Sequence, residues 1–206
     1  MVLNLYIPEP DLSRQIGRES RKAYARRVHE GFWDKWLKGP NVLDIGYRGD
    51  LGSETIVEGA YGIELGDSGY DGFHLPRLPF GLADTIHASH VLEHVEPASE
   101  YIREWWRALR VGGTLIIFVP HAYLYERRRT VPPSRWSPEH LTAYTLLSLS
   151  AVIEAALKPN TYRVRHLAEN DDGYDYTLPV DVHPVGCFEI ELVLQKIAEP
   201  VWKVEP

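Results

Sequence analysis

The chain has 206 residues, of which 44% are apolar and 25% are charged, and this composition is typical of a soluble globular protein. The formal net charge of −7 argues against general binding to nucleic acids, and no apolar run approaches the ~20 residues that a membrane span needs. The single cysteine, Cys187, excludes an intrachain disulfide and fits a reducing compartment, so we expect a cytoplasmic protein without a membrane span.

The N-terminal part, residues 1–40, is expected to form a helical cap. Apolar positions recur at near-helical spacing between Leu12 and Leu37, which predicts one or two amphipathic helices that end at Gly39-Pro40. Two roles stay open for this segment: packing against the edge of a sheet, or closing over a bound ligand.

The remainder, residues 41–200, alternates between strand and helix patterns and predicts a single α/β domain. The expected strands are Val42–Gly46, Tyr61–Leu65, a brief one near Phe73–Leu75, Ala83–His90, Thr114–Val119, Tyr162–Ala168 and Phe188–Lys196. The expected helices are a short one within Leu51–Gly59, one from Glu96-Pro97 to Gly112-Gly113, and one over Leu146–Leu157. We expect a mainly parallel sheet, with the last two strands antiparallel because no crossover helix joins them.

The stretch NVLDIGYRGD, residues 41–50, resembles the turn after the first strand of a nucleotide-binding sheet. A buried strand that ends in Asp44 is followed by a tight turn at Gly46, and twenty residues after Asp44 a second strand ends in Glu64. Nucleotide-binding sheets place such an acid against ribose hydroxyls, and their ligands lie beyond the carboxyl ends of the strands. Residues 87–94 and 120–123 are expected at the same ends, so we expect one site there.

The spaced motifs of this region resemble the class I S-adenosylmethionine-dependent methyltransferases. The resemblance rests on VLDIG (Val42–Gly46), Glu64, LPF (Leu78–Phe80), ASHVLEHV (Ala88–Val95) and LRVGGTLIIFVPH (Leu109–His121). It covers about residues 41–121 and the final two strands, and it implies a Rossmann-like three-layer fold. A less specific resemblance, in residues 124–144 and 186–196, is to methyltransferases of bacterial surface polysaccharides and other glycans.

This resemblance implies that S-adenosylmethionine is the cofactor. The methionine moiety should lie at the first turn, the ribose at Glu64, the adenine near Asp71 or Gly72, and the sulfonium beside Ser89 and His90. The complete set of expected cofactor-binding residues is Asp44, Gly46, Tyr47, Arg48, Gly49, Glu64, Leu65, Asp71, Gly72, Ser89 and His90.

Two positions depart from the family pattern, because Arg48 and Asp50 stand where further glycines are usual. Arg48 could contact the carboxylate of the cofactor, or it could mark a non-catalytic module that has lost cofactor binding and acts as a partner or scaffold. A dinucleotide-dependent oxidoreductase is disfavoured, since the glycines that cradle its phosphates are missing.

An acceptor hydroxyl needs a base, and the expected catalytic residues are His121, His140 and His94, with a purely structural histidine as the alternative in each case. His90, Glu93 and His94 would share one face if this segment were helical, and could then bind a divalent metal. The alternative is that Glu93 and His94 fix the following loop, and we expect no metal.

The aromatic and basic loop after Pro120 is expected to contact the acceptor, because guanidinium groups bind anions and aromatic faces stack on sugar rings. The expected substrate-binding residues are Tyr123, Tyr125, Arg128, Arg135 and Trp136. Solvated arginines and a tryptophan that merely anchors the loop remain the alternative. The predicted function is O-methylation of a carbohydrate or another small polar or anionic acceptor, with a homodimer left open and no nucleic-acid partner.

Overall fold

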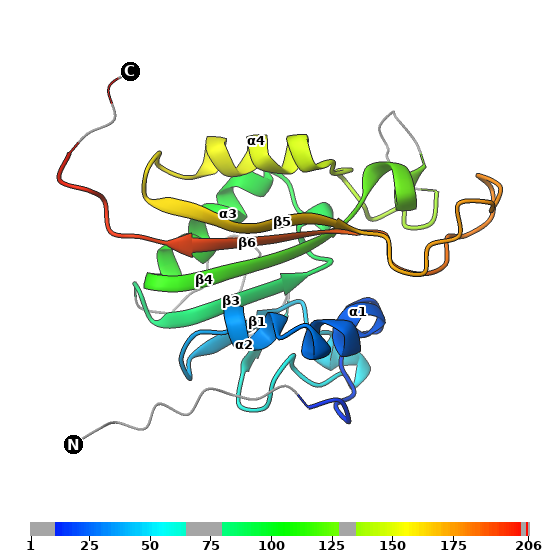
Figure 1. The fold of residues 1–206 in the computed structure, drawn as a ribbon, viewed down its shortest axis with the longest axis horizontal. Helices are drawn as coiled ribbons and strands as arrows, with labels where there is room; N and C mark the ends of the chain where they lie inside the picture. Colours follow the sequence, from blue (N-terminus) through cyan, green and yellow to red (C-terminus); the bar gives the residue numbers. More distant parts are fainter. Residues whose placement is uncertain (1–10, 65–79, 128–134, 203–204, 206) are drawn as a thin grey trace.

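A computed structural model describes residues 11–64, 80–127, 135–202 and 205. A six-stranded sheet with the order β2-β1-β3-β4-β6-β5 forms its centre (Figure 1). The strands are β1 (Val42–Ile45), β2 (Tyr61–Ile63), β3 (Ala83–Ser89), β4 (Leu109–Pro120), β5 (Tyr162–Asn170) and β6 (Glu189–Lys196). β1 pairs in parallel with β2 and β3, and β3 with β4, whereas β6 runs antiparallel to β4 and β5. The predicted Rossmann-like α/β fold with an antiparallel end is confirmed.

Helices cover both faces of the sheet. They are α1 (Arg18–His29), α2 (Phe32–Trp36), α3 (Ala98–Ala108) and α4 (Leu146–Ala156), with short helical turns η1 (Gly49–Leu51), η2 (Leu92–His94) and η3 (Ala122–Glu126). α3 and α4 lie on one side of the sheet and α1 and α2 on the other (Figure 1). Among the described residues, no helix is long and apolar enough to cross a bilayer.

β4 shows why its sequence carries an unbroken apolar run. Its alternate residues Leu115 and Ile117 belong to the core under α3 and α4, whereas Ile116 and Phe118 belong to the core under α1 and α2. A parallel strand covered on both faces needs apolar side chains at every position.

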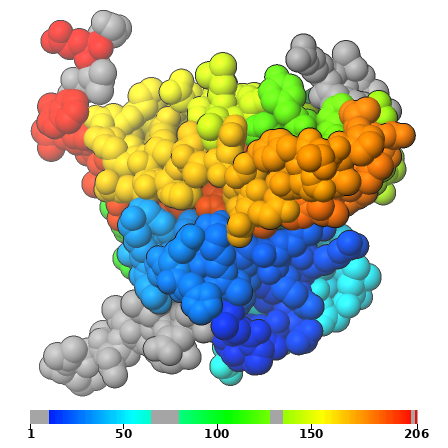
Figure 2. All heavy atoms as spheres, turned by 45° about the vertical axis from the view of Figure 1, so that its right-hand side comes forward, coloured from blue at the N-terminus to red at the C-terminus, as the bar shows by residue number. Residues whose placement is uncertain are grey.

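The N-terminal segment forms the second helical layer and is fixed to β6 by buried charges. Arg27 is fully buried, and its Nη2 lies 2.5 Å from Glu189 Oε1 and 2.9 Å from Glu191 Oε1. Arg26 lies 2.5 Å from Glu191 Oε1. Figure 2 shows this segment (blue) beside the orange segment that precedes β6, and Lys22 Nζ lies 3.9 Å from the ring centre of Phe188.

Two sequence predictions about helix boundaries were wrong. Within Leu51–Gly59 the structure has only the end of the single turn η1 instead of a helix. α3 ends at Ala108, and the two glycines, Gly112 and Gly113, lie inside β4. Between its pairings with Ala83 and Thr85, β4 advances from Leu109 to Thr114, so the glycines belong to a bulge. The strand expected near Phe73–Leu75 lies outside the described residues.

Candidate cofactor and acceptor site

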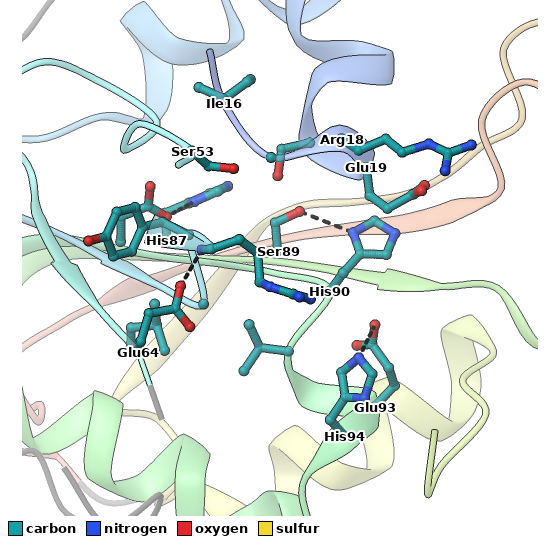
Figure 3. Close-up of a pocket in the computed structure, with 18 of the residues that line it drawn as sticks. Ile16, Arg18, Glu19, Ser53, Glu64, His87, Ser89, His90, Glu93 and His94 are labelled. Carbon is teal, nitrogen blue, oxygen red and sulfur yellow. Dashed lines mark hydrogen bonds and ion pairs between the residues drawn. The ribbon is translucent and has the colours of Figure 1, made fainter. Parts of the chain in front are cut away.

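A cavity of about 1160 Å³ opens at the carboxyl ends of β1, β2 and β3. Glu64 lies at one end of it and Glu93 with His94 at the other, with Ser89 and His90 between them (Figure 3). Seven of the expected cofactor-binding residues line the cavity: Asp44, Gly46, Tyr47, Arg48, Glu64, Ser89 and His90. Leu65, Asp71 and Gly72 lie outside the described residues, and Gly49 is not among the residues that line the cavity.

The turn after β1 requires glycine at Gly46. Its φ of +73° is a conformation that side chains disfavour, and a Cβ built there would lie 2.3 Å from Cγ2 of Val91. The Gly46 amide donates a 2.8 Å hydrogen bond to the carbonyl of Ile63, which ties the turn to β2. The backbone can therefore approach a ligand closely at this point.

Glu64 lies opposite this turn, and its carboxylate accepts hydrogen bonds from the backbone amides of Arg48 and Gly49, the latter at 3.2 Å. Burial raises the pKa of Glu64, and the two amide hydrogen bonds partly offset that effect. Arg48 has a φ of +65°, and its exposed guanidinium lies 3.6 Å from Asp50. The acid expected to hold ribose hydroxyls therefore also fixes the shape of the turn.

Asp44 is engaged within the protein. Its Oδ1 lies 2.7 Å from Nδ1 of His87, and its Oδ2 accepts a 2.6 Å hydrogen bond from the amide of Ile56. These bonds brace β1 against β3 and against the segment that leads to β2. Asp44 lines the cavity while both of its carboxylate oxygens have partners within the protein, so it would support cofactor binding by fixing the cavity wall.

The ring of Tyr47 packs against Gly49 and Gly62. Both positions require glycine, since a Cβ at Gly49 would lie 2.1 Å from the Tyr47 hydroxyl and one at Gly62 would lie 2.4 Å from its ring. The pair Ser89 and His90 follows β3, with Ser89 Oγ 3.1 Å from His90 Nδ1. Burial lowers the pKa of His90, which favours the neutral ring beside the cavity.

The other end of the cavity carries Glu93, His94 and His140. The Nε2 atoms of both histidines lie 3.8 Å from Oε1 of Glu93. Glu93 is fully buried, and within the described part of the chain neither of its carboxylate oxygens has a hydrogen-bond partner. Burial raises the pKa of Glu93 well above its usual value.

Backbone contacts bring the distant His140 to this position. The carbonyl of Glu93 accepts hydrogen bonds from the amides of Leu141, at 2.7 Å, and Thr142, at 3.2 Å. His140 Nδ1 lies 2.5 Å from Oε1 of Glu126, which is fully buried at the end of η3. His94 Nδ1 lies 3.3 Å from the carbonyl oxygen of Glu139. Sequence reasoning missed Glu126 and Glu139, and no spacing in the chain signals either contact.

The third expected base, His121, is placed differently. Its Nδ1 accepts hydrogen bonds from the amides of Tyr123 and Leu124, at 3.2 and 3.3 Å, and its Nε2 lies 3.0 Å from Glu169. His121 is not among the residues that line the cavity. Its side chain caps η3, which is a structural role.

Of the residues expected to contact substrate, Tyr125 lines the cavity. Its ring stacks on Phe188, with the ring centres 4.6 Å apart. Burial, with a contribution from Glu126, raises the pKa of Tyr125 to about 12, so its phenol stays protonated at neutral pH. Tyr123, Arg135 and Trp136 are not among the residues that line the cavity, and Arg128 lies outside the described residues.

The suggested metal group His90, Glu93 and His94 is not formed. η2 is a single turn that covers only Leu92–His94, and His90 precedes it with a φ of +56° and pairs with Ser89. The third group beside Glu93 and His94 is His140, which the sequence places 46 residues beyond His94.

Residues 69–117, which include β3, η2, α3 and most of β4, match the family model of a methyltransferase domain. The match covers 49 of the 206 residues and includes the end of β3 that lines the cavity. The cavity fits S-adenosylmethionine: it is large enough for a nucleoside with an acceptor, and it has a glycine turn facing an acid. No curated protein sequence matches the chain.

Solved structures of methyltransferases share this fold. A SAM-dependent methyltransferase from Archaeoglobus fulgidus has a TM-score of 0.54 and 17% identity, over 87% of this chain and 95% of that one. One from Aquifex aeolicus has a TM-score of 0.51 and 16% identity, over 88% and 94%. A putative methyltransferase from Haloferax volcanii, in complex with the Trm112 methyltransferase activator, has a TM-score of 0.54 and 13% identity, over 86% and 94%.

Proposed function

We propose that the protein transfers the methyl group of S-adenosylmethionine to a hydroxyl oxygen of a carbohydrate or another small polar acceptor. The observation that carries this proposal is the single cavity that joins Gly46 and Glu64 to Glu93, His94 and His140. A cofactor and an acceptor could therefore meet inside it, with Ser89 and His90 where they join.

At the cofactor end of the cavity, the protein binds S-adenosylmethionine and orients its methyl group. The glycine turn admits the ligand next to the backbone, and Glu64 offers carboxylate oxygens to ribose hydroxyls. Arg48 and Arg18 both line the cavity and supply positive charge for the carboxylate of the cofactor. In-line transfer depends strongly on such positioning, because the sulfonium is already a good leaving group.

At the acceptor end, the task is to bind the hydroxyl and help it to lose its proton. The C–S bond breaks as the C–O bond forms, sulfur keeps the electron pair of the broken bond, and the hydroxyl proton is released. His94 and His140 place two proton-accepting imidazole groups at one point of the cavity, beside Glu93. Glu126 holds the ring of His140 in position from the opposite side.

The charges around the acceptor end favour a hydroxyl over an anionic group. Glu19 and Glu139 line the cavity and would repel a phosphate or carboxylate. In the loop that was expected to bind anions, Arg127 instead donates hydrogen bonds to the carbonyls of Pro179 and Val182. Tyr125 and Phe188 line the cavity and offer aromatic surface to a sugar ring, as the resemblance to glycan methyltransferases suggests.

Transfer of labelled methyl from S-adenosylmethionine to pools of mono- and oligosaccharides tests this proposal. We expect label in hydroxyl-bearing acceptors and a loss of at least ten-fold in His140→Asn, with His29→Asn, an exposed residue of α1, as the matched control. Full turnover in His140→Asn would remove the cluster from the reaction.

The alternative of a non-catalytic module is favoured by one feature, since Glu64 is already bonded to the amides of its own turn. A protein that binds no cofactor and transfers no label would support that alternative. The H. volcanii complex suggests repeating the assay with an activator protein before that conclusion is drawn.

A further inference from the structure

We propose that Glu93, His94 and His140 form a binding site for a divalent zinc ion at the acceptor end of the cavity. One carboxylate oxygen and two imidazole nitrogens lie within 4.8 Å of one another there. Within the described part of the chain, this is the one group of three or more such ligands that converges in this way.

The hydrogen bonds around the two histidines fix which nitrogen faces the cluster. A carboxylate and a backbone carbonyl are acceptors, so the Nδ1 atoms of His140 and His94 carry the protons that Glu126 and Glu139 accept. In the neutral rings, each Nε2 then presents a lone pair toward Glu93. Metal-bound histidines characteristically donate their other N–H to a carboxylate or a backbone carbonyl in this way.

The buried carboxylate of Glu93 gives independent support for a cation at this point. Its side chain is 1% exposed, and no described donor reaches either of its oxygens. A buried carboxylate facing two lone pairs is unfavourable unless a cation or a proton lies between them. A zinc ion would satisfy all three groups at once.

The spacing suits tetrahedral zinc. Ligand atoms at about 2.1 Å from a tetrahedral ion lie roughly 3.4 Å apart. Both Nε2 atoms lie 3.8 Å from Oε1 of Glu93, a few tenths of an ångström beyond this spacing, and the three ligand atoms all lie within 4.8 Å of one another. Two histidines and one glutamate are a ligand set of catalytic zinc sites, which keep their fourth position open.

The fourth position would face the cavity, because all three residues line it and the side chain of His94 is 37% exposed. With zinc bound, the Nε2 atoms are ligands and no longer bases. An acceptor hydroxyl at the open position would instead become more acidic, as oxygen ligands of zinc do. Only this role of the open position rests on the proposed function; the binding of zinc does not.

Calorimetric titration of zinc chloride into the untagged, chelator-treated full chain tests the site. We expect one ion per chain and at least a 100-fold weaker affinity in Glu93→Gln, His94→Asn and His140→Asn. Glu126→Gln should cost about 10- to 100-fold through the orientation of His140. His29→Asn is the matched control and should bind zinc like the wild type.

The visible absorption spectrum of bound cobalt(II) tests the site in the wild-type protein, without any substituted variant. In the wild type, we expect the strong visible bands of a four-coordinate cobalt ion, which added zinc should remove. Either the weak spectrum of six-coordinate cobalt, or zinc affinity unchanged in all three ligand variants, would overturn the proposal. If S-adenosylmethionine still binds to those samples, the failure concerns the metal site alone and leaves the proposed function intact.

Discussion

Nδ1 of His140 lies 2.5 Å from Oε1 of Glu126, and both side chains are buried. Because the carboxylate can only accept, this contact holds the proton of His140 on Nδ1 and directs the lone pair of Nε2 toward Glu93. The contact joins η3 to the loop that carries His140, and it orients the ring of His140 toward Glu93.

The tautomer of His140 should therefore depend on Glu126. In Glu126→Gln, the amide group can donate to Nδ1, so we expect the ring to change from the Nδ1–H to the Nε2–H form. ¹⁵N chemical shifts of the imidazole ring report this change. His121 is an internal control, since its Nδ1 accepts backbone hydrogen bonds and its Nε2–H form should persist in both proteins. An unchanged His140 tautomer would contradict the orienting role of Glu126.

Replacement of Gly46 by alanine should destabilise the protein and impair ligand binding. The positive φ costs about 1–2 kcal/mol for a residue with a Cβ, and the clash with Val91 adds roughly 1–3 kcal/mol. Gly52→Ala is a matched control, because its φ is +79° but a Cβ there would have no neighbour within 4 Å. Denaturant unfolding should show a larger loss for Gly46→Ala, which Val91→Ala should partly restore. Equal losses at the two glycines would exclude the close contact as the cause.

The buried charges under α1 predict a specific loss of stability in acid. Burial alone would raise the pKa of Glu191, but the hydrogen bond from His166 and the charges of Arg27 and Arg26 outweigh it and lower the pKa from 4.5 to about 2. A depressed carboxyl pKa contributes stability that is present above the unfolded value and is lost as the pH falls toward the folded value. The contribution of Glu191 is thus complete at neutral pH and disappears between about pH 4.5 and 2.

Glu191→Gln should accordingly lower the free energy of unfolding by about 3 kcal/mol at pH 7, and this difference should shrink below pH 4.5. Urea unfolding at a series of pH values measures it. Glu199→Gln is the control, because Glu199 pairs with Lys158 on the surface, where an ion pair contributes about 0–1 kcal/mol. A pH-independent effect of Glu191→Gln would contradict the proposed charge coupling.

The sheet could be predicted from the sequence more completely than the candidate site. Continuous apolar runs such as residues 114–119 are a local signal, so the strands could be predicted, whereas the bulge at Gly112 and Gly113 depends on pairing with β3 and was misread as a helix end. The convergence of Glu64 and His94 followed from strand ends. The contact of Glu126 with His140 could not be predicted, because it joins η3 to a loop that is held in place by hydrogen bonds to the backbone of Glu93.

Arginines illustrate the same limit. The loop arginines resembled an anion site, yet Arg127 binds carbonyl groups of the segment before β6. Arg27 lies in the predicted amphipathic helix, but it is fully buried and pairs with two glutamates of β6. The sequence shows that an arginine is present, but it does not show which acceptor group the folded chain places beside it.

The central claim is that this cavity binds S-adenosylmethionine through the turn after β1 and the acid after β2. Calorimetry with S-adenosylmethionine and S-adenosylhomocysteine on the full chain tests it most directly. We predict binding of both ligands, weakened by about 1–3 kcal/mol in Glu64→Ala because ribose hydroxyls would lose their buried partner. The absence of binding at millimolar ligand, or equal affinity in the wild type and Glu64→Ala, would contradict the claim.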